Sequence, residues 1–141
     1  MKRFSSVLVV DSRGWLLLQE RDEHPVIDPE RWGFVGGGVE DGEDHEQAAY
    51  RELAEETGLD LAGRLEWFDA FEVFHEATGT KDVVHLFATA ADLRDEDIVV
   101  GEGRRIVFVS PDSLGALDLT AATRVALPAF LASDLYRRLA P

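Results

Sequence analysis

The sequence predicts an α/β fold in which a mixed central β-sheet is covered by helices on both faces. Two observations support this prediction. Apolar runs rich in β-branched and aromatic residues, each bounded by turn residues, recur along the chain and predict strands. Two other segments, residues 44–57 and 120–139, place apolar residues at helical spacing. Because the first helix falls between strands and the second follows them, we expect one layered domain spanning residues 1–141.

The N-terminal part of the chain predicts a hairpin. Residues Phe4 to Val10 are apolar and β-branched, as in a buried strand. Turn residues at 11–14 separate this strand from Trp15–Gln19, which we expect to form the second arm. A further short strand is predicted at residues 32–35, where it leads directly into three glycines.

A polar segment between these strands, Glu20–Arg31, contains Pro25 and Pro29 and predicts a surface loop. It lies just before the glycines, so we expect it to border a substrate pocket. Arg21 in this loop has two interpretations. It is either a solvated surface residue or a contact to a phosphate or a base.

The second half of the chain predicts more strands. Leu65–His75 is aromatic and apolar and predicts one strand or a bent pair of strands. Its predicted partner, residues 82–90, follows a turn at residues 77–81, and Arg104–Ser110 predicts another strand. These strands complete the expected sheet.

The C-terminal part predicts helical structure. Pro111–Leu114 begins a turn or a short helix, and Thr120 is a predicted N-cap for a helix that runs towards Leu139. Pro128 lies inside this helix, so we expect a kink or a break into two helices there.

Composition excludes several classes of function. The chain has 141 residues, a net charge of −14 and no cysteine, with 45% apolar and 30% charged residues. The acidic balance argues against binding of nucleic-acid polymers, whose phosphates require clustered Lys and Arg, but a nucleotide remains compatible where a metal screens its phosphates. The absence of cysteine excludes disulfides and a thiol nucleophile. No apolar run is long enough to cross a membrane, and we expect a cytoplasmic protein.

The most informative stretch runs from Gly36 to Leu59. A glycine-rich loop at its start leads into a helix that we expect to begin near Glu43 or Asp44. Asp44 and Gln47 have the spacing of a capping box. Gly58 is the usual residue type just past a helix end.

Three carboxylates share one side of this helix. At about 100° per residue, Glu52, Glu55 and Glu56 fall within an arc of roughly 100° around the small Ala48. Like charges one turn apart repel each other. A divalent cation with oxygen ligands, Mg²⁺ or Mn²⁺, would compensate for this repulsion. Arg51 flanks Glu55 from the other side. The other interpretation is a solvated helix face with salt bridges.

The stretch resembles the Nudix box, G-x5-E-x7-R-E-U-x-E-E-x-G-U, where U is an apolar aliphatic residue. All nine specified positions are filled, by Gly37, Glu43, Arg51, Glu52, Leu53, Glu55, Glu56, Gly58 and Leu59. This resemblance implies the α/β/α Nudix sandwich. It also implies a Mg²⁺- or Mn²⁺-dependent hydrolase that cleaves the phosphoanhydride bond of a nucleoside diphosphate linked to another moiety, by attack of water on phosphorus.

The resemblance also implies roles for single residues. The metal ligands would be Glu52, Glu55 and Glu56, together with the backbone carbonyl of Gly36. Arg51 would orient the carboxylates.

For Arg51 the implied ion-pair partner is Glu55 or Glu43. Several Nudix enzymes use one more acid from a loop beyond the box, as a metal ligand or as the base. Glu102 fits this acid best, and otherwise it is a solvated loop residue. The base itself stays open among Glu52, Glu55 and Glu102.

The substrate is less well determined. Residues 74–76 lack the Pro or Tyr markers of the ADP-ribose and diadenosine-polyphosphate subfamilies. The short chain favours a nucleoside triphosphate or a related nucleotide as the substrate. Gly37 and Gly38 offer backbone groups to this substrate at close range. Four aromatic residues either stack a base or fill the core, and they are Trp32, Phe34, Phe74 and Phe87.

Two strand histidines, His75 and His85, are either structural or catalytic. Two other functions also stay open. A non-catalytic nucleotide-binding or sensor domain would have the same fold, although such domains commonly lose the box acids. An enzyme of nucleotide-sugar metabolism would have an altered box. Dimers are common in the family, so a homodimer is possible.

Overall fold

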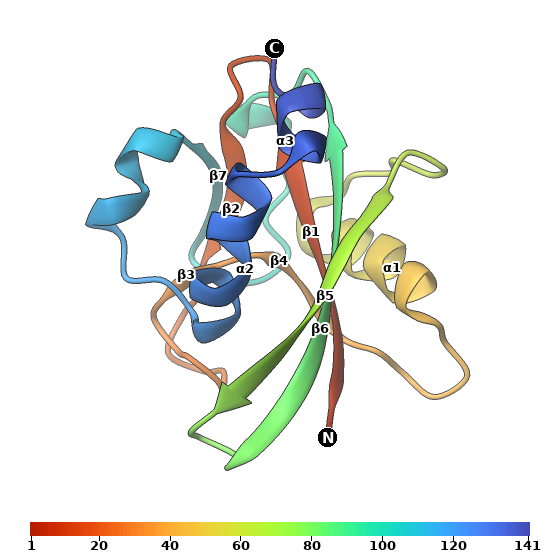
Figure 1. Ribbon diagram of the computed structural model, residues 1–141, viewed down its shortest axis with the longest axis vertical. Helices are drawn as coiled ribbons and strands as arrows, with labels where there is room; N and C mark the ends of the chain where they lie inside the picture. Colours follow the sequence, from red (N-terminus) through yellow and green to blue (C-terminus); the bar gives the residue numbers. More distant parts are fainter.

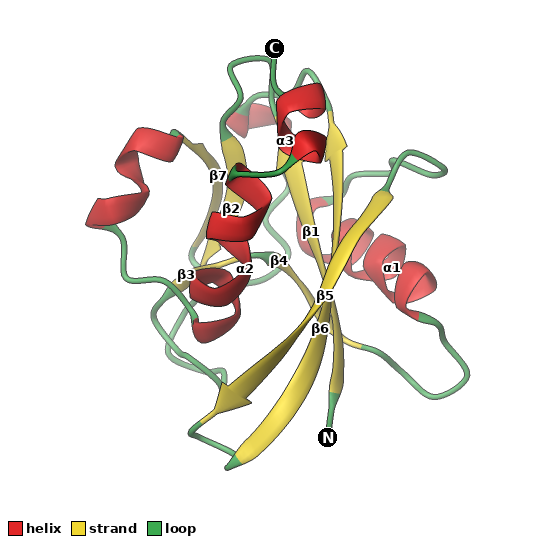
Figure 2. Ribbon diagram, viewed as in Figure 1, coloured by secondary structure: helices red, strands yellow, loops and turns green.

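A seven-stranded mixed sheet forms the centre of the computed structural model, which describes residues 1–141, and helices flank the sheet (Figure 1; Figure 2). The strands are β1 (Arg3–Val10), β2 (Leu16–Glu20), β3 (Trp32–Gly33), β4 (Val35–Gly38), β5 (Glu66–His75), β6 (Thr80–Ala90) and β7 (Arg105–Val109). The helices are α1 (His45–Thr57), α2 (Ala121–Leu131) and α3 (Asp134–Leu139), with 3-10 turns η1 (Asp95–Asp97) and η2 (Pro111–Ala116).

The sheet is built around β1. Its strand order is β3-β2-β1-β6-β5, while β7 pairs with β2 and β4 pairs with β1. Only β1 and β6 run parallel, and the other pairs are antiparallel. The β4 strand occupies the N-terminal half of β1, from Phe4 to Val7, and β2 meets β1 only at Val10. Two different strands therefore share one side of β1.

Alternation along β1 divides the core into two layers, because successive side chains of a strand point to opposite faces. Val7 and Val9 pack in a cluster with Leu53 of α1. Leu8 and Val10 pack in a second cluster with α2 and α3. Figure 1 shows α1 and α2 on opposite sides of the sheet. The predicted α/β/α sandwich is confirmed.

Helix α1 begins and ends where the sequence predicted. The Asp44 side chain accepts a hydrogen bond from the Gln47 backbone N–H at 2.7 Å. In turn, the Gln47 side chain accepts one from the Asp44 backbone N–H at 2.9 Å. Gly58 ends the helix in the left-handed conformation, with φ of 73°. This conformation favours glycine because it has no Cβ.

The C-terminal helices differ from the prediction in one respect. Thr120 caps α2 as expected, but α2 continues through Pro128 to Leu131. The break into two helices comes later, at Ser133, whose Oγ accepts a hydrogen bond from the Tyr136 N–H at 3.1 Å. Proline removes one hydrogen bond from a helix, and here a side-chain cap rather than this loss determines the boundary. None of the helices is long and apolar enough to cross a membrane.

Candidate active site

Three of the predicted acids meet in one cleft. Glu52 and Glu56 reach it from α1, and Glu102 reaches it from the loop before β7. The cleft has a volume of about 520 Å³. Glu56 is buried, with 3% of its surface exposed. Glu55 does not line this cleft, and 58% of its side chain is exposed to solvent.

The glycines of β4 bring the backbone close to these acids. The Gly36 N–H donates a hydrogen bond to Glu56 Oε2 at 2.9 Å. A Cβ at Gly36 would overlap the backbone of Ser5 and Ser6 on β1. A Cβ at Gly37 would lie 2.5 Å from Glu52 Oε1. Only glycine fits at position 36 against the backbone of β1, and only glycine fits at position 37 while Glu52 keeps its place.

Arg51 holds the acids at the rim of the cleft. Its guanidinium donates two hydrogen bonds to Glu43, at 2.7 and 2.9 Å, and one to the Gly38 carbonyl at 3.0 Å. It also contacts Glu52 at 2.9 Å and Glu55 at 3.3 Å. The hydrogen bonds from Arg51 are the main reason that the pKa of Glu43 falls to about 2. Both ion pairs predicted for Arg51 are therefore present, and Arg51 also fixes the orientation of Glu52.

Burial and neighbouring charges raise the pKa values of Glu56 and Glu52. Burial raises the pKa of Glu56 to about 8, the Gly36 N–H opposes this shift, and the charges of Glu52 and Glu102 add to it. Burial also raises the pKa of Glu52, against the hydrogen bond from Arg51. A buried carboxylate with acidic neighbours is stable in its charged form only beside a positive charge. The site therefore favours a cation.

A loop wrapped around the end of α1 places Glu102. The Val99 N–H donates to the Thr57 carbonyl at 3.0 Å, and the Gly101 N–H donates to the Glu56 carbonyl at 2.8 Å. A Cβ at Gly101 would overlap the backbone carbonyl of Glu55. These bonds satisfy carbonyls that a helix end leaves free, and they fix the residue that follows Gly101.

Two residues that position Glu102 were missed in the sequence. Gln19 is buried, and its Nε2 donates to the Glu102 carbonyl at 3.0 Å. Gly101 allows the loop to approach α1. The signal available for Gly101 was the glycine on each side of Glu102, whereas nothing in the pattern indicates Gln19.

The predicted substrate contacts separate into two groups. Arg21, Phe34, Gly37 and Gly38 line the cleft. Arg21 Nη2 donates to the Ile27 carbonyl at 3.1 Å, while its Nε is enclosed without a hydrogen-bond partner. Trp32 does not line the cleft.

The other aromatic candidates lie elsewhere. Trp32 is 8% exposed and packs in the core layer of α2, beneath the Arg105 guanidinium at 5.0 Å. Phe87 lies in the other core layer, and Phe74 is largely exposed. For Trp32 and Phe87, the structure agrees with the core interpretation.

The donor set of the cleft suits a hard divalent cation, since carboxylate and carbonyl oxygens are the ligands that Mg²⁺ and Mn²⁺ prefer. The three acids are not drawn together around a single point, because their oxygens do not all lie within 4.8 Å of one another. The trio that meets this distance is Asp22, Glu23 and His24 on the exposed part of the loop. Exposed acidic groups commonly gather without binding an ion, so the cleft is the stronger candidate.

Comparison with known proteins identifies the family. A family model described as "NUDIX domain" matches residues 2–130. Among curated proteins, the chain is 31% identical to nucleoside triphosphatase NudI of Enterobacter sp. (strain 638) over 124 residues, which cover 83% of this chain and 88% of the relative.

Solved structures show the same fold. The MutT protein from Methanosarcina mazei Go1 superposes with a TM-score of 0.74 at 25% identity and covers 92% of this chain and 91% of its own. A bifunctional NMN adenylyltransferase/ADP ribose pyrophosphatase from Francisella tularensis, complexed with AMP and a Mn ion, gives a TM-score of 0.72. Its identity of 19%, over 92% of this chain and 40% of that one, shows the fold alone.

The family model spans most of the chain, and Gly37, Glu52 and Glu56 of the Nudix box meet in one cleft. The chain therefore belongs to the NUDIX domain family of hydrolases.

Proposed function

We propose that this Nudix hydrolase cleaves a phosphoanhydride bond of a nucleoside triphosphate or a related nucleotide, with Mg²⁺ or Mn²⁺ as its metal. The main support is the meeting of Glu52, Glu56 and Glu102 beside the glycines of β4 in one cleft. The chemistry fits, because a buried carboxylate whose pKa is raised to about 8 requires a nearby cation to stay charged at neutral pH.

The metal would be held by Glu52, Glu56 and Glu102 together with the Gly36 carbonyl. When bound, a divalent cation screens the charge of the phosphate oxygens and lowers the pKa of a coordinated water. Glu55 stays a predicted ligand at the rim, where Arg51 holds it.

The chain's own residues supply orientation and proton transfer. Arg51 keeps Glu52 turned towards the cleft, and the Gly36 N–H holds one oxygen of Glu56. Glu52 and Glu102 line the cleft, so we favour them over Glu55 as the base that removes a proton from the attacking water.

The substrate class follows from the walls of the cleft. Gly37 and Gly38 expose backbone without side chains, which allows phosphates to come close. We assign Arg21 to the substrate, because it lines the cleft and its Nη1 makes no hydrogen bond within the protein, whereas Nη2 donates to the Ile27 carbonyl. A nucleoside triphosphate agrees with the activity named for the NudI relative.

Catalysis is favoured over a sensor role because every box acid is present and Arg51 donates hydrogen bonds to five surrounding oxygens. A nucleotide-sugar hydrolase is the second candidate. Analysis of products from a screen of nucleotides, nucleotide sugars and dinucleotides in Mg²⁺ would separate the two activities.

The decisive variant is Glu52→Gln. We expect turnover to fall on the order of 10²-fold or more, because a metal ligand or base is lost while the shape is kept. Glu46→Gln is the matched control, since Glu46 lies exposed on the first turn of the same helix. Equal rates for wild type and Glu52→Gln would contradict the assignment of the metal site.

A further inference from the structure

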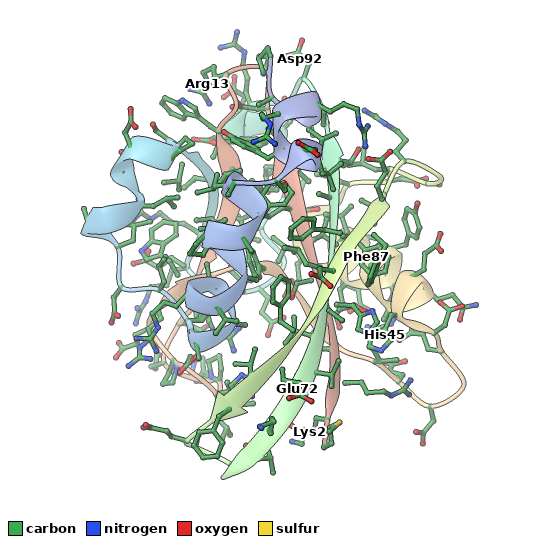
Figure 3. The ribbon with its side chains drawn as sticks, viewed as in Figure 1. Lys2, Arg13, His45, Glu72, Phe87 and Asp92 are labelled. Atoms are coloured by element: carbon green, nitrogen blue, oxygen red, sulfur yellow. The ribbon has the colours of Figure 1, made fainter.

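His75, which lines the cleft, belongs to a buried histidine–aspartate pair. His75 ends β5 and is 5% exposed, and Asp82 on the neighbouring β6 is fully buried. His75 Nδ1 lies 2.7 Å from Asp82 Oδ2. Asp82 also accepts hydrogen bonds from the Lys2 backbone N–H at 2.9 Å and from Thr80 Oγ1 at 3.3 Å. Figure 3 shows Lys2 at the same end of the molecule.

These contacts fix the tautomer of His75. Burial alone raises the pKa of Asp82, but hydrogen bonds from His75, Lys2 and Thr80 lower it below its usual value. The group is therefore a carboxylate, which can only accept hydrogen bonds. Nδ1 of His75 must carry the proton that faces Asp82. In the neutral imidazole, Nε2 is then a hydrogen-bond acceptor.

Nε2 of His75 is available to a ligand. It makes no hydrogen bond within the protein. It is also not fully enclosed, since Arg21 Nε is the one enclosed side-chain atom without a partner. His75 lines the same cleft as Glu52 and Glu56. The ring of Phe4 meets the imidazole edge-on at 5.9 Å between centroids and limits its rotation.

The distance across the sheet suits a nucleotide. The strands run in the order β4, β1, β6, β5, so His75 lies three strand spacings from the glycines. Three spacings amount to about 14 Å across the sheet, and His75 lies a further four residues, or about 13 Å, along β5 from Phe71, which is in line with Gly38. The wall between them is formed by Phe4 and Val84, paired on β1 and β6. A substrate with its phosphates at the glycines would lay its base along this apolar wall, with its edge towards His75.

We propose that His75 is a specificity-determining residue that accepts a hydrogen bond from an N–H group of the nucleobase, amino or imino, and that Asp82 positions it. This proposal rests on the proposed function, because it assumes that the phosphates bind beside the glycines. A fixed acceptor discriminates against a base that lacks the matching donor, since Nε2 would lose water without gaining a partner.

The test uses two replacements, each of which keeps a polar group at the position of only one imidazole nitrogen. In His75→Asn, the side-chain amide takes the place of Nδ1 and keeps a donor for Asp82, but nothing replaces Nε2. In His75→Gln, the amide takes the place of Nε2. His85→Asn is the control: His85 lies outside the cleft, where it stacks on His45 at 3.6 Å and accepts a hydrogen bond from Trp67 Nε1 at 3.0 Å.

The measurement is kcat/KM in Mg²⁺ for the four nucleoside triphosphates, and for analogues of the preferred one whose amino group is removed or whose imino nitrogen is methylated. For the wild type and His85→Asn, we expect one analogue to be about tenfold poorer or worse, as for loss of one hydrogen bond. His75→Asn should have the same kcat/KM for this analogue as for its parent nucleotide. His75→Gln should restore part of the difference in kcat/KM between the two.

Several results would overturn the proposal. A wild-type enzyme indifferent to every analogue excludes a base contact, whether or not the variants fold. An equal loss on all substrates in His75→Asn places His75 on a group that all nucleotides share, such as phosphate. Unchanged ratios in His75→Asn give His75 a structural role. Hydrolysis of no nucleotide by the wild type would overturn the proposed function itself, so the two failures are distinguishable.

Discussion

Glu56 illustrates how one residue of the cleft links stability to protonation. Its carboxyl group is buried beside Glu52 and Glu102, and its pKa is raised to about 8 from an ordinary value of 4.5. The folded protein therefore binds a proton here that the unfolded chain has already lost, across the pH range between these two values. Folding is thus linked to protonation at the centre of the site.

The first prediction concerns this linkage. Because the native state binds more protons than the unfolded state, the free energy of unfolding of the metal-free protein should decrease as pH rises from about 4.5 to about 8. Urea unfolding in chelator across this range measures the slope. Glu56→Gln should show a flatter slope than wild type, because its side chain does not titrate. A wild type that gains stability relative to Glu56→Gln as pH rises would contradict the shift.

The second prediction concerns Gly37. Alanine there places a Cβ 2.5 Å from Glu52 Oε1, so Glu52 must move. We expect Gly37→Ala to lower kcat at least about tenfold while the fold is kept, because misplacing a catalytic group is costly to rate. Gly115→Ala is the control, since its Cβ would meet nothing within 4 Å. Steady-state kinetics with circular dichroism would check both variants, and full activity of Gly37→Ala would show that the close approach is unimportant.

Sequence predicted much of the site at this scale. The box spacing identified Glu52 and Glu56, because helical geometry places them on one side of α1. It did not predict that Glu55 would lie outside the cleft. Arg51 holds Glu55 at the rim, and such a side-chain contact is not visible in residue spacing.

At the scale of elements, the loop of residues 99–102 is as important as α1. It forms hydrogen bonds with the last turn of the helix and delivers Glu102 into the cleft. The sequence identified Glu102 as a candidate but not the contacts that hold it. Gln19 and Glu102 are 83 positions apart, and their bond joins a side chain to a backbone carbonyl. Patterns along the chain record neither property.

The third prediction tests this loop. In Gly101→Ala, the new Cβ would overlap the Glu55 carbonyl and push the loop away from α1. We expect a large loss of kcat, because Glu102 leaves the cleft, together with reduced thermal stability from the lost Glu56–Gly101 hydrogen bond. Kinetics and melting curves report the two effects. Unchanged activity would mean that Glu102 takes no part in the reaction.

The break between the last two helices shows that a local sequence signal can be overridden by packing. The sequence predicted a kink or a break into two helices at Pro128, whereas α2 continues to Leu131 and Ser133 caps α3. Pro128 removes a single N–H, and the packing of Leu127 and Phe130 in the core layer supports the helix on both sides of it. Tertiary contacts here outweigh a local preference.

For the whole molecule, the family, the sandwich fold and the hydrolase class were predicted correctly from the sequence. The fold followed because strand and helix patterns are local and the box is specific. Substrate choice did not follow, because the cleft combines side chains from distant segments, from Lys2 to Ala122. The homodimer stays a prediction, which light scattering would check.

The fourth prediction concerns metal and global stability. A ligand that binds only the folded state raises stability by mass action. We therefore expect millimolar Mg²⁺ or Mn²⁺ to raise the melting temperature of the chelator-treated wild type by several degrees. Glu52→Gln and Glu56→Gln should show a smaller shift, and Glu46→Gln should match wild type. A melting temperature insensitive to both ions would count against a metal site in the cleft.

The run of three glycines in β4 has a wider consequence. Because no side chains fill the sheet at these glycines, the acids reach the cleft from the layer of α1. Phe4, Val84 and Thr120 line the same cleft but belong to the layer of α2. On the roles proposed above, reaction and recognition lie on opposite sides of the sheet. Mutations on the α2 side can change which nucleotide is preferred and leave the hydrolytic apparatus intact, so a family with this architecture can acquire new substrates without reinventing its chemistry.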